Sequence, residues 1–316
     1  KHLDGLNIVP IYGGASIYTQ MRQICSGAQI VVATPGRMLD MLKRKKVDVS
    51  AISWLVLDEA DEMLDMGFKE DLNAILSGTP GSKRVLLFSA TMAREIERIA
   101  KSYMKNPVAI TVGAKNMGAE NVHHQYYVVH AKDRYVALKR IADYYPNIYA
   151  IIFCRTKIET QEIADALIED GYSADALHGD LSQPQRDSVM NRFRSRNLQM
   201  LVATDVAARG IDVTDLTHII NYNLPDDIEN YTHRSGRTGR AGKSGISIAI
   251  VNLKEIFKIR QIEKQLGKKF AAAKIPTGSE VCEKQLYHLV DKVKNTEIQH
   301  QEIEPFLPAI YEQLQG

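Results

Sequence analysis

Short apolar runs rich in β-branched residues recur along almost the whole chain and alternate with longer amphipathic stretches. The runs occupy residues 30–33, 55–57, 85–88, 108–112, 122–129, 151–153, 201–203, 218–220 and 246–250. Runs this short and this apolar are typical of strands buried in parallel sheets, where crossover helices cover both faces. The pattern therefore predicts an α/β fold built on parallel sheets.

The chain is long enough for more than one domain. Its 316 residues are 45% hydrophobic, which suits two packed domains plus an appendage. A small, polar segment at 113–119 separates two strand-like runs and is typical of an interdomain linker. Beyond residue 251 the apolar residues follow helical spacing only. We therefore predict a first domain at residues 1–113, a second at 121–251 and a helical extension at 252–316.

Charge, cysteines and hydropathy exclude several classes of protein. With 40 Lys and Arg against 38 Asp and Glu the formal charge is +2, so any basic surface for nucleic acid must be local. Cys25, Cys154 and Cys282 lie far apart without zinc-ligand spacing, which is typical of a reducing compartment. No apolar stretch reaches membrane-spanning length and no signal peptide opens the chain. We therefore expect a cytoplasmic protein without a membrane partner.

Two adjacent carboxylates, Asp58 and Glu59, directly follow the apolar run 54–57. A buried parallel strand ends at the carboxyl edge of its sheet, where ligands of open α/β sheets bind. One carboxylate can there approach a hydrated Mg²⁺ while the other faces the water that attacks a γ-phosphate. If a helix begins after Glu59, Asp61 lies on its first turn and can bond groups from elsewhere, His233 included. The alternative is a solvated acidic turn that caps a helix.

A similar arrangement follows the run 85–88, where Ser89 and Thr91 come directly after the strand. We expect these two hydroxyls to lie on a neighbouring strand end and to hydrogen-bond the acidic site. Hydroxyls after strands also commonly cap helices, and that alternative stays open.

An arginine-rich segment, residues 233–240, lies far downstream. If it is helical, His233, Arg237 and Arg240 fall at i, i+4 and i+7 and share one face, where they can neutralise phosphate charge. The two glycines of the segment would cost a plain helix about 1 kcal/mol each, which indicates that a partner approaches closely. The alternative is a charged helix face exposed to water.

Seven motifs stand in the order that is found in one family, and they occupy residues 13–14, 34–37, 58–61, 89–91, 151–156, 203–212 and 233–240. On these motifs the chain resembles the DEAD-box ATP-dependent RNA helicases of superfamily 2 across nearly all of residues 8–251. Its tail resembles that of the bacterial cold-shock members. The resemblance implies two RecA-like parallel-sheet domains, the first incomplete here, and a short helical C-terminal appendage.

One element of the family is missing from the sequence. No Gly-x-x-x-x-Gly-Lys-Ser/Thr phosphate loop occurs in the 316 residues, and the chain does not open with Met. By the resemblance, the phosphate loop and the adenine-reading segment would precede Lys1. We therefore expect a fragment that binds ATP poorly and is inactive alone.

The resemblance implies a role for each residue of the acidic site. It makes Glu59 the residue that activates water and Asp58 the residue that holds Mg²⁺ through bound waters. Ser89 and Thr91 would couple hydrolysis to domain closure, and Asp61 belongs to the same catalytic set.

In the second domain the resemblance places Arg237 and Arg240 on the γ-phosphate and Gly210 with Asp212 near the ribose. His233 completes the expected catalytic set. ATP and Mg²⁺ are the cofactors that these roles imply.

The RNA contacts of the family map onto six residues, which are donors or close-approach glycines suited to phosphates and sugars. They are Gly14, Thr34, Gly36, Arg37, Arg155 and Thr204. Contacts of this kind read the backbone, so we expect RNA binding without sequence preference. Plain turn chemistry is the alternative for residues 13–14 and 34–36.

These expectations describe RNA-stimulated ATP hydrolysis that drives local duplex unwinding and the remodelling of ribonucleoproteins. Two alternatives stay open: an RNA-binding or assembly module without ATPase activity of its own, and a DNA-directed helicase on the same fold. By the resemblance, residues 252–316 mediate a homodimer, and a single amphipathic domain packing on its own core is the alternative. Ribonucleoprotein or ribosome-assembly partners are expected, and the sequence does not indicate which RNA is bound.

Overall fold

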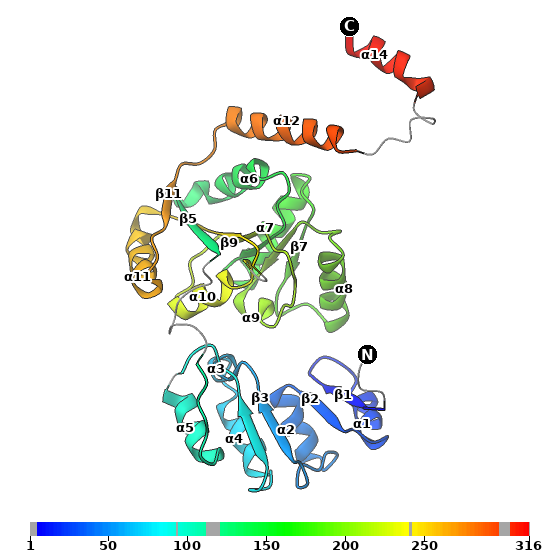
Figure 1. Cartoon of the computed structure of the whole chain (residues 1–316), viewed down its shortest axis with the longest axis vertical. Coiled ribbons are helices and arrows are strands. Elements are labelled where there is room, and N and C mark those ends of the chain that lie inside the picture. The colour runs from blue at the N-terminus through cyan, green and yellow to red at the C-terminus, as the bar shows by residue number, and fades with distance from the viewer. Residues whose placement is uncertain (1–4, 93, 112–120, 240–241, 297–303, 316) are drawn as a thin grey trace. The chain divides into compact units, whose positions relative to one another are not determined.

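The computed structural model describes residues 5–92, 94–111, 121–239, 242–296 and 304–315 (Figure 1). Its Cα packing divides the chain into two compact units. The first comprises Lys1–Gly118, Leu177–Arg192 and Val206–Gly210, and the second comprises Ala119–Ala176, Phe193–Asp205 and Ile211–Gly316. The expected linker at 113–119 lies outside the described residues, and the domain boundaries derived from the sequence stay a prediction.

The first unit contains two pairs of parallel strands. β1 (Ile8–Ile11) pairs with β2 (Ile30–Ala33), and β3 (Trp54–Leu57) pairs with β4 (Arg84–Leu87). The helices are α1 (Ile17–Cys25), α2 (Pro35–Lys43), α3 (Ala60–Asp65), α4 (Lys69–Ser77) and α5 (Arg94–Tyr103). The sequence predicted β2, β3 and β4, whereas β1 was missed because Pro10 interrupts its apolar run.

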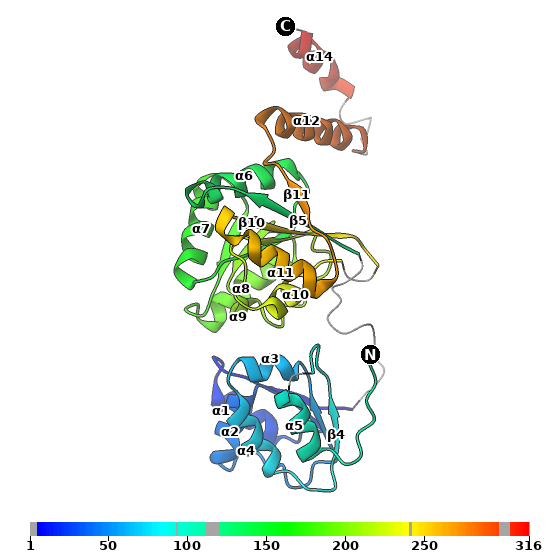
Figure 2. The ribbon, with the colours of Figure 1, turned by 90° about the vertical axis from the view of Figure 1, so that its left-hand side faces the viewer.

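Helices cover one face of β3 and β4 (Figure 2). Leu55, Leu57 and Leu87 pack with apolar residues of α3, α4 and α5. The alternate residues Trp54 and Val56 are each 55% exposed. Because successive side chains of a strand point to opposite faces, the described part of this unit presents an apolar sheet face to solvent.

The second unit is built on a seven-stranded sheet with the strand order β11-β5-β10-β9-β6-β8-β7. The strands are β5 (Val122–Val128), β6 (Ala150–Phe153), β7 (Ala174–Leu177), β8 (Met200–Ala203), β9 (His218–Asn221), β10 (Gly245–Val251) and β11 (Ala271–Ala273). β5 pairs in parallel with β10 and β11, β9 with β10 and β6, and β6 with β8. The α/β fold with parallel sheets that the sequence predicted is therefore confirmed.

The helical elements of the remaining chain connect or follow these strands. They are η1 (Ala131–Asp133), α6 (Arg134–Tyr144), α7 (Lys157–Glu169), α8 (Gln183–Arg194), α9 (Asp205–Ala208), α10 (Ile228–Ser235), η2 (Leu253–Glu255), α11 (Ile256–Leu266), α12 (Gly278–Lys294), η3 (Glu304–Phe306) and α14 (Leu307–Gln315). The helical C-terminal region that the sequence predicted is present. None of the helices among the described residues is both long and apolar enough to cross a membrane.

Helices cover both faces of the seven-stranded sheet (Figure 2), and each face has its own apolar core. On β10, Ile248 and Ile250 pack with residues of α6 and α7, whereas Ala249 and Val251 pack with residues of α10 and α11. All four side chains are completely buried. Because side chains alternate along a strand, the sheet separates the two pairs of helices and is covered on both faces.

Two segments differ from the sequence prediction. Residues 108–111 form no strand in the structure, and Val108 and Ile110 are 86% and 85% exposed. β11 forms in a region where only helices were predicted, because Ala271–Ala273 pairs with β5 at the edge of the sheet. In both cases the presence of a strand depends on an available partner edge, which the local apolar pattern does not contain.

Candidate functional site

The acidic pair lies at the carboxyl end of β3, as the sequence predicted. Leu57 ends the strand, Asp58 and Glu59 follow it as exposed residues, and α3 begins at Ala60. Phe88, at the end of β4, donates its N–H to the Leu57 carbonyl (2.8 Å) and accepts the Ala60 N–H (3.1 Å). These two bonds hold the two strand ends side by side.

Glu59 adopts a left-handed backbone conformation with φ 51° and ψ 48°. This conformation is uncommon for residues other than glycine, costs on the order of 1 to 3 kcal/mol, and persists only where the surroundings impose it. The Glu59 N–H donates to Asp58 Oδ1 (3.0 Å), and its carbonyl accepts the Met63 N–H (3.1 Å). Backbone strain thus coincides with the exposed acidic pair, and such strain clusters at functional sites.

Asp61 joins the acidic strand end to the neighbouring one. Its residue is 5% exposed, and Oδ2 accepts the Thr91 backbone N–H at 2.7 Å. This link uses a backbone N–H rather than the predicted hydroxyls. Ser89 Oγ donates to the Thr91 carbonyl (2.6 Å), and Thr91 Oγ1 is buried without a hydrogen-bond partner among the residues that the structure describes. The structure therefore brings together all five residues predicted for this site.

The donor set at this strand end suits Mg²⁺. That ion prefers oxygen ligands and is commonly held by one or two carboxylates together with substrate phosphates and waters. Asp58 and Glu59 offer such carboxylates, and the described residues contain no cluster of three or more His, Cys, Asp or Glu that could hold a metal. The exposed carboxylate of Asp58 would suit such an ion held through water, which would neutralise phosphate charge when bound.

The turn that contains Gly13 and Gly14 and the start of α2, with Thr34 as its N-cap, lie side by side at the carboxyl ends of β1 and β2. Thr34 donates its backbone N–H to the Ile11 carbonyl (2.9 Å), and Arg37 donates to the Ala15 carbonyl (3.0 Å). Gly14 has a φ of 80°, which side-chain-bearing residues rarely adopt. The structure thus brings four of the predicted RNA contacts together, namely Gly14, Thr34, Gly36 and Arg37.

The helix expected over residues 233–240 is wrong at residues 236–239. α10 ends at Ser235, Gly236 is its C-cap, and Arg237 lies in the turn that follows. His233 and Arg237 therefore do not share a helix face. The expected i, i+4 pair is lost because α10 ends at Ser235, before Arg237.

The second glycine of the segment, Gly239, explains the close approach that the sequence indicated. It has a φ of 67°, and a Cβ built on it would lie 2.7 Å from Cγ2 of Val122 on β5. The close partner is therefore the sheet of the same unit rather than a ligand. Arg240 lies outside the described residues.

Arg237 lies beside the segment predicted to contact the ribose. Its Nη1 donates to the carbonyl of Ile211 at 3.1 Å, and Ile211 stands between Gly210 and Asp212 in the sequence. Gly210 has a φ of 67°, which explains why glycine is needed at this turn. Arg237, the predicted γ-phosphate contact, is thus hydrogen-bonded to the residue that precedes Asp212.

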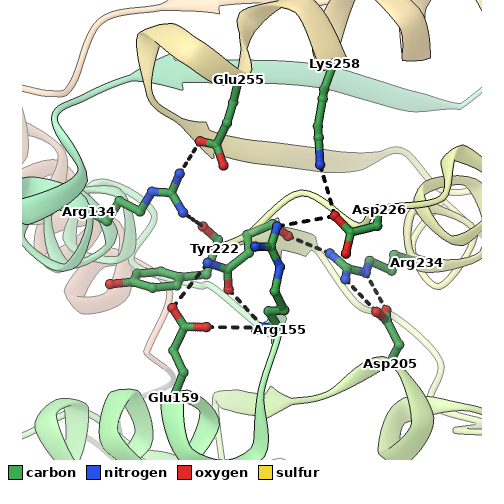
Figure 3. Close-up of polar contacts among 10 residues, drawn as sticks. Arg134, Arg155, Glu159, Asp205, Tyr222, Asp226, Arg234, Glu255 and Lys258 are labelled. Carbon is green, nitrogen blue, oxygen red and sulfur yellow. Dashed lines mark hydrogen bonds and ion pairs between the residues drawn. The ribbon is translucent and has the colours of Figure 1, made fainter.

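Arg234 is a residue of this region that sequence reasoning missed (Figure 3). Its side chain is 3% exposed, and Nε and Nη2 bind the two carboxylate oxygens of Asp205 at 2.5 and 2.7 Å. Nη1 donates to Asn221 Oδ1 (2.9 Å) and to the Asn223 carbonyl (2.8 Å), and the guanidinium carbon lies 4.8 Å from the Phe153 ring centroid. Arg234 therefore fixes α10 to the ends of three strands.

A buried polar network supports α10 against the sheet. The Tyr231 hydroxyl pairs with His124 Nδ1 (2.9 Å) and with Ser247 Oγ (3.0 Å), and Ser235 Oγ pairs with Ser247 Oγ (2.9 Å). His124 stacks on Phe270 with 4.7 Å between ring centroids. Burial lowers the pKa of His124 to about 4, so this imidazole is neutral near pH 7. The network orients the helix that carries His233.

Arg155 lies just beyond the end of β6 (Figure 3). Its backbone N–H donates to Asn223 Oδ1 (2.9 Å) and Glu159 Oε2 (3.3 Å), and the Asn223 amide donates to Glu159 Oε1 (3.2 Å). The backbone is therefore fixed, while the Arg155 side chain is 50% exposed. Thr204 follows the end of β8, which pairs with β6, so these two predicted RNA contacts lie at adjacent strand ends.

Comparison with protein families supports the interpretation of both units. The DEAD/DEAH box helicase profile matches residues 1–99, and the helicase conserved C-terminal domain matches residues 133–242. A helical domain described as that of a probable ATP-dependent RNA helicase matches residues 281–316. The chain belongs to the DEAD/DEAH box helicase family, as its motifs predicted.

Individual relatives agree with this membership. The chain is 44% identical to the ATP-dependent RNA helicase DeaD of Mycobacterium tuberculosis over 294 residues, which are 93% of this chain and 52% of the relative. It is 43% identical to the DEAD-box ATP-dependent RNA helicase CshA of Geobacillus kaustophilus over 290 residues, which are 92% of this chain and 62% of the relative. The chain thus spans between half and two thirds of the length of these relatives.

A solved structure shows the same architecture. Dbp5 of S. cerevisiae bound to RNA and ADP BeF3 is 28% identical and has a TM-score of 0.78, with 90% of this chain and 74% of that chain covered. The predicted RecA-like fold is therefore confirmed.

Proposed function

We propose that the protein hydrolyses ATP in response to RNA and uses this hydrolysis to unwind short RNA duplexes and to remodel ribonucleoproteins. The observation that carries the proposal is the acidic strand end. There Asp58 and Glu59 stand exposed on a strained turn, and Asp61 binds the Thr91 backbone at 2.7 Å. The relatives described as ATP-dependent RNA helicases support it.

Each residue of the nucleotide site has a proposed role. Glu59 takes the proton of the attacking water, and Arg237 with Arg240 stabilises the charge that develops on the γ-phosphate. Gly210 and Asp212 lie along the ribose. Through its link to Asp61, the turn at Ser89 and Thr91 would transmit the state of the nucleotide to the strand end. His233 is proposed to complete the catalytic set.

We propose that RNA is held through its backbone. The donors Thr34, Arg37, Arg155 and Thr204 lie at the carboxyl ends of parallel strands, and Gly14 and Gly36 permit close approach of phosphates and sugars. Because none of these contacts reads a base edge, binding is expected to be independent of sequence.

The test measures steady-state ATP hydrolysis in a chimaera. The chain is joined behind the segment that precedes the aligned region in the Geobacillus kaustophilus relative. We expect turnover that rises with single-stranded RNA and not with DNA of the same sequence, because 2′-hydroxyls distinguish the two. The 316-residue chain alone serves as the control, and its RNA affinity is measured in parallel.

The outcomes separate the three functions that the sequence left open. Equal stimulation by RNA and DNA would assign a DNA-directed or unselective helicase. RNA binding without turnover in the chimaera would assign an RNA-binding module. Neither binding nor turnover would end the proposal.

We further propose a homodimer through residues 252–316. On α12, Leu286, Leu289 and Val293 recur at helical spacing and are 61%, 57% and 65% exposed. An apolar stripe of this kind suits a second helix. Light scattering of the chain is expected to give the mass of a dimer, which substitution of all three residues by Ser reduces to that of a monomer. A monomer at high concentration would exclude the dimer.

The protein is proposed to act in the cytoplasm on ribonucleoproteins or assembling ribosomes. Its three cysteines are free, which suits a reducing compartment. Co-sedimentation with ribosomal particles that RNase abolishes would support these partners, and sedimentation apart from all RNA-containing particles would exclude them.

A further inference from the structure

One carboxylate of the second unit is shared by two cations from different elements (Figure 3). Asp226 Oδ1 lies 3.5 Å from Nη2 of Arg155 and 3.0 Å from Nζ of Lys258 on α11. The Asp226 side chain is 77% exposed, so solvent reaches the cluster. The hydrogen bond from Lys258, followed by the charge of Arg155, holds the pKa of Asp226 below its usual range. The carboxylate is therefore ionised and bound as an anion.

Stability does not account for this convergence. Ion pairs this exposed contribute about 0 to 1 kcal/mol. The backbone segments that carry both cations are also held without Asp226. The Arg155 backbone is fixed by Asn223, and Lys258 lies one turn after Glu255, whose carboxylate binds the buried Arg134. The fold thus holds the backbones of Arg155 and Lys258 independently of Asp226.

Two cations that converge on one oxygen can equally bind a phosphate. The cluster lies at the carboxyl edge of the sheet, where ligands of open α/β sheets bind. Arg155 is already a proposed RNA contact, whereas neither Lys258 nor Asp226 belongs to any motif that the sequence singled out. The carboxylate of Asp226 occupies the place that such a phosphate would take.

We propose that Arg155 and Lys258 together bind one backbone phosphate of single-stranded RNA, and that Asp226 fills this phosphate site in the RNA-free protein. This site rests on the proposed RNA binding. RNA must then displace an internal anion. Asp226 therefore lowers RNA affinity, and Lys258 adds a contact from α11, the helix that follows β10.

The test measures binding of a fluorescein-labelled U10 RNA to the 316-residue chain by anisotropy at several KCl concentrations. Lys258→Ala is expected to weaken binding about 3- to 10-fold and to reduce the slope of log K against log salt by about 0.7, the value for one contact to a single strand. Asp226→Asn is expected to strengthen binding by about 3-fold, because it removes the competing charge. Lys258→Arg should retain affinity.

Matched controls use the same chemistry elsewhere on the surface. Lys264→Ala changes an exposed lysine of the same helix, and Asp291→Asn an exposed aspartate of α12, and both should leave affinity unchanged. Asp226→Asn should have no effect in an Arg155→Ala/Lys258→Ala background. If the chain binds RNA but Lys258→Ala behaves like Lys264→Ala, or Asp226→Asn like Asp291→Asn, the phosphate site alone is overturned.

A second arm distinguishes an RNA phosphate from free phosphate. Sodium phosphate replaces part of the chloride at constant ionic strength. The RNA affinity of the unchanged chain, divided by that of Lys258→Ala, should stay the same. If inorganic phosphate brings that ratio to one, the site takes the free anion and the RNA assignment is wrong. Absence of any RNA binding by the unchanged chain would overturn this site together with the proposed RNA function.

Discussion

Replacing Glu59 with glutamine is expected to lower RNA-stimulated ATP turnover in the chimaera by about 10²- to 10⁴-fold, the usual contribution of a positioned general base. Glutamine keeps the size and polarity of the side chain and loses its basicity. The loss corresponds to about 3 to 5 kcal/mol of transition-state stabilisation. Because the proposed RNA contacts belong to other residues, RNA affinity should not change. Both quantities are measured on the same preparation.

The matched control is Glu70→Gln, which makes the same chemical change at an exposed position of α4. It should leave turnover unchanged. Glu59→Asp gives a second check. It keeps a carboxylate but shortens its reach by one methylene, so it should retain only part of the rate. If Glu59→Gln turns over ATP as fast as the unchanged protein, another group activates the water.

The acidic strand end could be predicted because its position depends on local sequence. Charged residues directly follow the apolar run 54–57, and residues that follow a parallel strand lie at the edge of its sheet. The left-handed conformation of Glu59 could not be predicted. It depends on the bond from Ala60 to Phe88, which joins segments remote in sequence. The link from Asp61 to the Thr91 backbone was missed for the same reason, since it joins residues that are 30 positions apart.

The arginine segment was predicted less well, because helical spacing was extended beyond Ser235, where α10 ends. Arg234 lies outside the helix face shared by positions i, i+4 and i+7, and it was not predicted. A signal was nevertheless present. Arg234 follows Tyr231 by three residues, and residues at this spacing share a helix face, so an arginine there faces the core beside a buried tyrosine. The sequence of β11 offered no comparable signal, since three alanines do not specify a strand. They form a strand because they pair with the edge of β5.

Replacing Arg234 with methionine is expected to lower the free energy of unfolding of the second unit by about 3 to 5 kcal/mol, the usual cost of removing one partner of a buried pair. The substitution keeps the volume and the apolar stem of the side chain. It leaves the carboxylate of Asp205 without its bidentate partner, and it leaves Asn221 Oδ1 and the Asn223 carbonyl without this donor. The free energy is measured by hydrogen exchange of the β6 amides, which lie in the core of the sheet.

Arg196→Met is the matched control, because it makes the same substitution at an arginine that is exposed rather than buried. Arg196 pairs with Asp215 at 3.4 Å, but its side chain is 57% exposed, so its loss should cost under about 1 kcal/mol. The double variant Arg234→Met/Asp205→Leu should recover part of the stability, because the half-buried carboxylate is then no longer left unpaired. If Arg234→Met lowers the free energy of unfolding no more than Arg196→Met does, then α10 is held by the Tyr231 network alone. Arg234 would in that case be free to act on a ligand instead of serving as the anchor of the helix.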